Sequence, residues 1–233
     1  FSERLTGKTF AVRARRHGEH TFRSIDLERT VGAALMQASG ARGVDLKSPE
    51  VEVRIEVHGD QFHIAHRRHR GLGGYPLGSV ENVLTLISGG YDSSVAAYLM
   101  MRRGLRSHFL FFNLGGTAHE VGVRQVVHYL WDRYGASHSA KFISVPFEGV
   151  VAEIMRSVNH RHWGVVLKRQ MLMAAAEIAR KNNSVGVVTG DAVAQVSSQT
   201  LSNLNVVDRA SDEVVLRPLV SMDKESIIRI ARE

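Results

Sequence analysis

The chain has 233 residues, 44% of them hydrophobic, which is enough to give each of two ordinary domains a buried core. Its formal net charge of +7 suits a polyanionic partner such as RNA, although many basic proteins share this balance. The chain contains no cysteine, which excludes disulfides, thiolate metal sites and sulfur chemistry performed by these residues alone.

No apolar run approaches the roughly 20 residues needed to cross a bilayer, and no charged-then-apolar leader opens the chain. We therefore expect a cytoplasmic protein with no membrane partner. The chain begins at Phe1 and stops at Glu233 within a helical pattern, so we interpret it as part of a longer protein.

The first part of the chain has the pattern of an α+β domain. In residues 9–14, apolar and polar residues alternate as in a half-buried strand. In residues 25–36, apolar residues recur at helical spacing, and Ser24 or Asp26 is available as the N-cap. Residues 51–64 alternate strictly around a Gly-Asp turn, which predicts an antiparallel hairpin with one wet face.

Residues 71–79 contain four glycines and a proline, which is the composition of a connector, and we place the domain boundary there, between 1–75 and 76–233. After it, apolar strands alternate with longer helices, which predicts a mostly parallel sheet with helices on both faces. The expected strands are 84–87, 108–113, 141–145 and 185–189, and the expected helices are 95–103, 121–134, 150–157 and 167–181.

The segment Ser88-Gly89-Gly90-Tyr91-Asp92-Ser93 lies between the first of these strands and its helix. Two adjacent glycines permit a tight turn whose amide groups converge on an anion at a helix N-terminus, and the two serines add hydroxyl donors. No Gly-Lys-Ser or Gly-Lys-Thr closes the loop, which disfavours a Walker A kinase or GTPase. An ordinary strand-to-helix connection, with Asp92 as an N-cap, is the competing interpretation.

The motif SGGxDS resembles the PP-loop of ATP pyrophosphatases, which release pyrophosphate and transfer AMP. Four further stretches resemble the tRNA 4-thiouridine synthetases, or tRNA sulfurtransferases, collinearly from about Thr9 to the end: 111–131, 165–171, 189–204 and 216–227. The resemblance implies an α/β fold, in which a parallel-sheet PP-loop domain of the adenine nucleotide α-hydrolase type follows an α+β THUMP domain that binds RNA.

In the family, ATP with Mg²⁺ adenylylates the O4 of a uridine in tRNA, and a persulfide sulfur then displaces AMP. The implied partners are tRNA and a persulfide-carrying cysteine desulfurase; a homodimer is one option for the assembly. The family's catalytic cysteine lies beyond residue 233, so this segment is expected to adenylylate without thiolating. Some members also supply sulfur for the thiazole of thiamine, and nothing in these residues separates the two roles.

The resemblance assigns catalysis to Asp92 and Lys224, and a lysine near the α-phosphate would offset charge that develops as pyrophosphate leaves. The implied ATP-binding residues are Leu86, Ile87, Ser88, Gly89, Gly90, Ser93, Lys168, Gly190 and Gln199. His119 and Glu120 are expected at the same sheet edge, where they would line the nucleotide pocket. From the residues alone, Lys168 could lie on a solvated helix face, and Gly190 could simply form a turn at the end of a strand. The Gln199 side chain could hydrogen-bond only to the backbone of its own loop. Ala194 departs from the family, which often has glycine there.

Two basic clusters are candidate contacts for tRNA phosphates, and the THUMP resemblance favours this interpretation over solvated strand ends. Their arginines are Arg13, Arg15 and Arg16 in the first cluster and Arg67, Arg68 and Arg70 in the second. We predict no transition-metal site: the tempting pair His160 and His162 lacks a carboxylate or cysteine at a familiar zinc spacing.

Two other functions remain open at this stage. One is a PP-loop ATP pyrophosphatase that acts on a small molecule and does not depend on tRNA. The other is a non-catalytic tRNA-binding module that keeps a nucleotide pocket for regulation.

Overall fold

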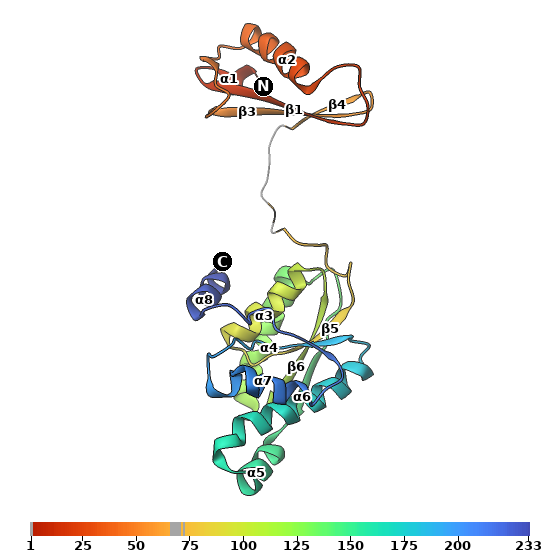
Figure 1. The fold of residues 1–233 in the computed structure, drawn as a ribbon, viewed down its shortest axis with the longest axis vertical. Helices are drawn as coiled ribbons and strands as arrows, with labels where there is room; N and C mark the ends of the chain where they lie inside the picture. The colour runs from red at the N-terminus through yellow and green to blue at the C-terminus, as the bar shows by residue number, and fades with distance from the viewer. Residues whose placement is uncertain (1, 66–70, 72) are drawn as a thin grey trace. The chain divides into compact units, whose positions relative to one another are not determined.

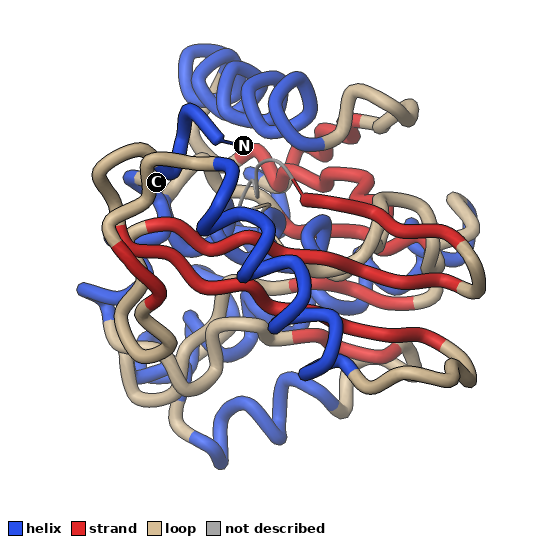
Figure 2. The backbone as a smooth tube through the Cα atoms, turned by 90° about the horizontal axis from the view of Figure 1, so that it is seen from above, coloured by secondary structure: helices blue, strands red, loops and turns tan. Residues whose placement is uncertain are grey.

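A computed structural model describes residues 2–65, 71 and 73–233, which form two compact units, Phe1–Gly71 and Leu72–Glu233. Each unit has its own sheet (Figures 1 and 2). Figure 2 colours strands red and helices blue. None of the helices in the described ranges is both long and apolar enough to span a membrane.

The first unit is a four-stranded sheet covered on one face by a helix. Its elements are α1 (Ser2–Leu5), β1 (Thr9–His17), α2 (Ser24–Ala38), β2 (Gly43–Val44), β3 (Val51–His58) and β4 (Gln61–Ala65). The strand order is β2-β1-β3-β4, and β3 and β4 form the antiparallel hairpin that the alternation predicted. Buried valines and Ile55 on β3 pack beneath partly buried side chains of α2, which leaves the other sheet face exposed.

The N-terminus of α2 differs from the prediction. Its N-cap is Arg23, and neither Ser24 nor Asp26 takes that position. Asp26 instead occupies the third helical position, where its carboxylate accepts a 3.0 Å hydrogen bond from the Arg23 amide. The Asp26 amide donates in return to the Arg23 carbonyl at 3.0 Å. Residue preferences for the N-cap position alone do not predict this start.

The second unit is a five-stranded parallel sheet with helices on both faces, as predicted. Its strands are β5 (Asn82–Leu86), β6 (Arg106–Asn113), β7 (Phe142–Pro146), β8 (Gly186–Val188) and β9 (Val214–Leu216), in the order β7-β6-β5-β8-β9. Its helices are α3 (Tyr91–Arg102), α4 (Thr117–Tyr134), α5 (Glu148–Ser157), α6 (Trp163–Lys181), α7 (Leu201–Asp208) and α8 (Lys224–Arg232), with short 3₁₀ turns at His160–His162 and Ser197–Gln199.

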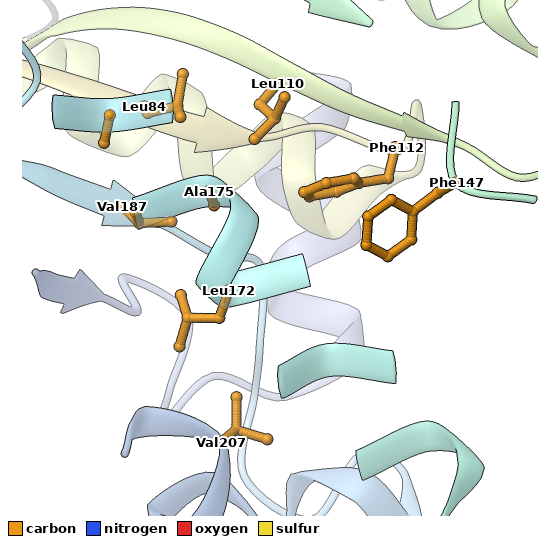
Figure 3. Packing of buried hydrophobic residues seen from close by; sticks show 9 residues of the cluster. Leu84, Leu110, Phe112, Phe147, Leu172, Ala175, Val187 and Val207 are labelled. Atoms are coloured by element: carbon orange, nitrogen blue, oxygen red, sulfur yellow. The ribbon is translucent and has the colours of Figure 1, made fainter. Parts of the chain in front are cut away.

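Both faces of this sheet are buried, so its strands are continuous apolar runs. On β6, Phe109 and Phe111 pack with α3 and α4, while Leu110 and Phe112 face α6. Figure 3 shows the second of these clusters, in which Leu172 of α6 and Val207 of α7 approach the sheet. The fold class expected from the sequence is confirmed.

The order in which strands are added to this parallel sheet reverses between the neighbouring strands β5 and β8. From β5 the chain proceeds outward through β6 to β7, and then returns to the other side of β5 for β8 and β9. Such a reversal leaves a crevice beyond the carboxyl ends of the central strands, where open α/β sheets bind ligands. The segment 88–93 follows β5 at this place.

Candidate active site

The turn after β5 is shaped by one glycine that no other residue replaces easily. Gly89 has φ +82°, and a Cβ there would lie 3.1 Å from Val123 Cγ2 of α4. Gly90 is the N-cap of α3, so the interpretation of Asp92 as an N-cap is wrong. The first-turn amides of a helix lack intrahelical partners, and they carry partial positive charge suited to a phosphate.

The two serine hydroxyls of the turn bond to the turn itself. Ser93 Oγ accepts a 3.2 Å hydrogen bond from the Ser88 amide and donates to the Gly90 carbonyl at 3.1 Å. The hydroxyls of Ser88 and Ser93 lie 3.2 Å apart, and Ser93 is buried. Ser93 therefore fixes the shape of the turn in addition to any donor role toward a ligand.

Asp92 and Lys224, the two predicted catalytic residues, are in direct contact although 132 positions separate them. Lys224 Nζ lies 2.5 Å from Asp92 Oδ1, and Gln195 Nε2 donates to Asp92 Oδ2 at 3.0 Å. Asp92 is in the first turn of α3 and Lys224 begins α8, whose N-cap Asp223 accepts from the Ser226 amide. The pair is partly exposed, with 27% of the Asp92 side chain and 48% of the Lys224 side chain accessible.

Gly190 allows the loop after β8 to approach the phosphate turn closely. A Cβ at Gly190 would lie 2.9 Å from both the Asp92 carbonyl carbon and the Ser93 amide nitrogen. Both are backbone atoms, which cannot rotate away. The glycine is therefore required by close packing, and the simpler strand-end-turn interpretation is insufficient.

Asp191, which the sequence motifs did not single out, connects the other candidate ATP residues. Its Oδ1 accepts from Lys168 Nζ at 2.6 Å and from Gln199 Nε2 at 2.9 Å, while Oδ2 accepts from Thr189 Oγ1 at 2.8 Å. Lys168 is thus turned inward and does not belong to a solvated helix face. Gln199 is buried against Asp191, so its side chain does not serve its own loop alone.

Opposing effects determine the charge of Asp191. Burial acts to raise its pKa, but the Lys168 charge and the hydrogen bonds from Lys168, Gln199 and Thr189 outweigh burial and hold the pKa below its usual value. Arg217 also approaches, with Nε 3.6 Å from Asp191 Oδ2. The carboxylate is therefore ionised, and it orients two predicted ATP contacts.

A cavity of about 350 Å³ lies over these groups at the carboxyl ends of β5, β6 and β8. Part of its wall is the apolar cluster of Figure 3, where Leu110, Phe112, Leu172 and Val207 are labelled. The polar part contains Ser88, Asp92, Ser93, His119, Lys168, Thr189, Gly190, Asp191 and Arg217. One wall can therefore take a flat apolar ring and the other an anion.

The cavity brings together most of the predicted ATP residues. Leu86, Ile87, Ser88, Ser93, Lys168 and Gly190 line it, together with Asp92. Gly89 and Gly90 form the turn without lining this cavity, Gln199 is linked to it through Asp191, and Lys224 through Asp92.

His119 and Glu120 have different surroundings. His119 lines the cavity, and its Nε2 lies 3.2 Å from the Ser88 carbonyl oxygen. Glu120 does not line it: hydrogen bonds from Ser144 and then Arg124 lower the pKa of its carboxyl, and it also accepts from Asn113. The expectation for Glu120 is corrected, because β7 rather than a ligand engages its carboxylate.

Of the arginines predicted to contact RNA, the structure describes those of the first cluster, on β1 of the first unit. On β1, Arg15 is exposed, whereas Arg13 donates to the Leu46 carbonyl at 2.5 Å and Arg16 donates to the Phe22 carbonyl. Arg67, Arg68 and Arg70 lie outside the described residues. Arg15 is thus the arginine of β1 whose side chain is most available to a ligand.

The fold and the site define a class: a PP-loop domain of the adenine nucleotide α-hydrolase type preceded by a THUMP domain. Residues 78–233 match the family model described as thiamine biosynthesis protein (ThiI), and residues 2–67 match the THUMP domain model. The chain belongs to the ThiI family.

Curated relatives are named tRNA sulfurtransferase. That of Marinobacter nauticus is 82% identical over all 233 residues, and that of Pseudomonas aeruginosa strain UCBPP-PA14 is 57% identical. The chain covers 48% of each, so it spans about half of their length. A crystal structure of a 4-thiouridine synthetase–RNA complex with bound ATP is 26% identical, with a TM-score of 0.82 over 99% of this chain and 60% of that one.

Proposed function

We propose that this chain is the RNA-binding and ATP-dependent segment of a tRNA sulfurtransferase that makes 4-thiouridine. The uridine O4 attacks the α-phosphorus of ATP, and the bond from that phosphorus to the bridging oxygen breaks as pyrophosphate leaves. In the second step the terminal sulfur of a persulfide attacks C4, and the C4–O4 bond breaks as AMP leaves. A second cysteine thiol, from outside these residues, then attacks the carrier sulfur, so that the S–S bond breaks, a disulfide forms and the terminal sulfur stays on C4. A neutral uridine oxygen leaves poorly, so the first step makes the second feasible.

The residues of the cavity have separable roles in the first step. The turn 88–90 and the first amides of α3 hold phosphate oxygens, and Lys168 adds a positive charge that Asp191 orients. Lys224, placed by Asp92, offsets charge that develops as pyrophosphate departs. The apolar wall that includes Phe112 receives the adenine ring.

Magnesium fits the donors present at this site. Asp92 supplies a partly exposed carboxylate, the type of oxygen ligand that Mg²⁺ prefers, beside the turn that would hold phosphates. When bound, the ion would neutralise phosphate charge. Asp191 is a poorer candidate, because only 12% of its side chain is accessible against 27% for Asp92, and three side chains rather than two donate to its oxygens.

The contact between Lys224 and Asp92, which lines the cavity, is the observation that carries this proposal. A charged pair built from residues so distant in sequence, beside a phosphate turn, serves group transfer better than passive nucleotide storage. Membership of the ThiI family and the names of its curated relatives make tRNA uridine the favoured acceptor.

The test is tRNA-dependent chemistry with ATP labelled at the α-phosphate. Mixing the chain with labelled ATP, Mg²⁺ and unmodified tRNA should give pyrophosphate and label on the tRNA. Asp92→Asn should abolish this label, whereas the matched control Asp132→Asn, an exposed aspartate of α4, should not.

The two other functions predict different products. A pyrophosphatase acting on a small molecule would form AMP and pyrophosphate only with that metabolite, whether or not tRNA is present. A non-catalytic module would bind tRNA and ATP, form no AMP under any condition, and bind equally well as Asp92→Asn.

The sulfur must come from outside these residues, because they contain no cysteine. A cysteine desulfurase carrying a persulfide is the donor we propose, with the thiolation taking place in the cytoplasm. Sulfur supply for thiamine would use the same donor, and the family description supports keeping this second role.

A homodimer is the assembly we would test first, by light scattering with and without tRNA.

A further inference from the structure

The uncovered face of the first unit's sheet has a row of histidines at one end. β1 and β3 pair in parallel with His17 opposite His58, and β4 places His63 opposite Glu56. Side chains two residues apart on a strand share a face, so Glu56 and His58 lie on the same side of β3. That side faces away from α2, because the intervening Val57 is buried in the core.

Three of these side chains converge. One ligand atom from each of His17, Glu56 and His58 lies within 4.8 Å of the other two, and all three residues are exposed. The His17 and His58 rings stack with centroids 4.3 Å apart and an interplanar angle of 7°. Glu56 Oε2 lies 3.6 Å from His58 Nε2, and the His63 ring stands edge-on to His58 at 5.5 Å.

This donor set matches the preferences of a borderline-soft divalent ion. Zinc binds imidazole nitrogen and carboxylate oxygen at about 2.0–2.2 Å, which places neighbouring donors about 3.3 Å apart around a tetrahedral ion. The observed separations exceed this by up to about an ångström and a half, and the two stacked imidazoles must turn out of their parallel arrangement before both can point a nitrogen at one ion. Exposed side chains can make both adjustments by rotating. Two donors come from alternate positions of one strand and the third from its hydrogen-bonded neighbour, so the backbone holds all three.

We propose that His17, Glu56 and His58 bind one divalent transition-metal ion such as Zn²⁺, with the fourth position taken by water. The ion ties the end of β1 to the end of β3 on the uncovered face. Among the residues that the structure describes, this is the group of histidine and acidic donors that converges closely enough for such a site. The prediction of no transition-metal site considered only His160 and His162, which lie in the second unit.

The site differs from the ATP cavity in unit, donors and ion. It uses residues of the first unit alone, and its ligands include two imidazoles, which suit zinc rather than the oxygen-seeking Mg²⁺. The proposal therefore does not depend on the proposed function, and the two can fail separately.

Calorimetric titration of the metal-free 233-residue chain with ZnCl₂ tests the proposal. We expect one saturable Zn²⁺ ion per chain, a higher melting temperature when it is bound, and visible absorption bands when Co²⁺ replaces it. His17→Gln and His58→Gln should each weaken Zn²⁺ affinity at least tenfold, about 1.4 kcal/mol. Glu56→Gln, which keeps the shape of the side chain, should weaken it as well.

The matched control is the double variant His160→Gln with His162→Gln, which removes two exposed histidines elsewhere and should leave the saturable phase unchanged. The chain has 12 histidines, so weak background binding should persist in every variant. Circular dichroism of the metal-free variants checks that they fold. The proposal is overturned by the absence of a saturable phase, by unchanged affinity in His17→Gln and His58→Gln, or by an equal loss in the control.

Discussion

At the scale of single residues, Gly190 shows most directly how packing constrains the site. Gly190→Ala must displace either the loop after β8 or the first turn of α3, because the new methyl group would meet backbone atoms at 2.9 Å. We expect a loss of about 1–3 kcal/mol in the free energy of unfolding and weaker ATP binding. Urea denaturation and calorimetric titration with ATP measure the two effects.

The matched control for that variant is Gly149→Ala on the exposed side of α5, where a Cβ would meet nothing within 4 Å. Alanine should there stabilise the helix by about 0.5–1 kcal/mol. If both alanines changed stability in the same direction and by similar amounts, the close approach at Gly190 would not be the cause.

Ala194 has a side chain at a position where the backbone conformation favours glycine. It has φ +62°, in the left-handed region, where an L-residue with a Cβ is disfavoured by roughly 1–2 kcal/mol. The glycine that the family resemblance implied at this position suits this backbone conformation better than alanine does. Ala194→Gly should raise the free energy of unfolding by about 1 kcal/mol, measured by urea denaturation. A decrease would mean that the methyl group has favourable contacts that outweigh the strain.

Asp191 gives a pH prediction with a defined sign. Its pKa is lower in the folded chain than the ordinary value of 3.8, so the ionised carboxylate stabilises the fold. This contribution is fully present above the unfolded pKa and is lost as the pH falls below 3.8 and through the folded pKa. Asp191→Asn should remove that part of the pH dependence, which denaturation between pH 2 and pH 6 (roughly the range in which carboxyls titrate) measures.

Glu120 and other carboxyls also have lowered pKa values, so the difference between the parent chain and Asp191→Asn is the relevant quantity. Equal slopes for the two chains over this acid range would contradict the assignment. At neutral pH the same variant should bind ATP more weakly, because Lys168 and Gln199 lose the acceptor that orients them.

At the scale of elements, the placement of Lys224 depends on the start of α8. Asp223 caps this helix by accepting a 2.7 Å hydrogen bond from the Ser226 amide. Asp223→Ala should cost about 1 kcal/mol of stability and reduce tRNA adenylylation, because the first turn that holds Lys224 frays. Asp212→Ala, which removes an exposed aspartate outside any helix, is the control and should change neither quantity.

The periodicity of apolar residues predicted the parallel sheet and the hairpin, but it missed some elements and placed the first residue of some helices too late. α3 begins at Tyr91 and α6 at Trp163, each four residues before the predicted start. The first turn of α3 carries polar residues without apolar spacing, whereas that of α6 contains Gly164, which is a poor helix former. The short α7 and β9 were not predicted: eight and three residues are too few to establish a period.

The candidate site could be predicted only where a motif or the family resemblance marked it. The glycine turn and its flanking residues follow from local sequence. Asp191 does not, because its partners Lys168 and Arg217 are distant in the chain and meet it only in the folded sheet. Its one local signal is its position directly after Gly190, three residues beyond the buried strand β8.

At the scale of the whole molecule, the separation into two units predicts that RNA and nucleotide binding can be weakened independently. Arg15→Ala combined with Arg68→Ala should lower tRNA affinity and reduce the slope of affinity against salt by about 1 for each phosphate that an arginine no longer neutralises. ATP affinity should not change. Filter binding at several salt concentrations and calorimetry with ATP measure these quantities.

Arg156→Ala, an exposed arginine of α5 in the second unit, provides the matched control and should leave the salt slope unaltered. Loss of ATP affinity in the double variant would contradict the division of labour between the units. A uniform effect of all three substitutions on tRNA would point to net charge rather than to a defined surface.

In the proposed phosphate site, the hydroxyl of Ser93 influences nucleotide affinity. Because it already bonds to the Ser88 amide and the Gly90 carbonyl, the turn has its working shape before any ligand arrives. A preorganised loop loses little conformational entropy when it binds a nucleotide, so most of the interaction energy with the phosphates contributes to affinity. Removing that hydroxyl would therefore harm recognition by making the empty protein more disordered.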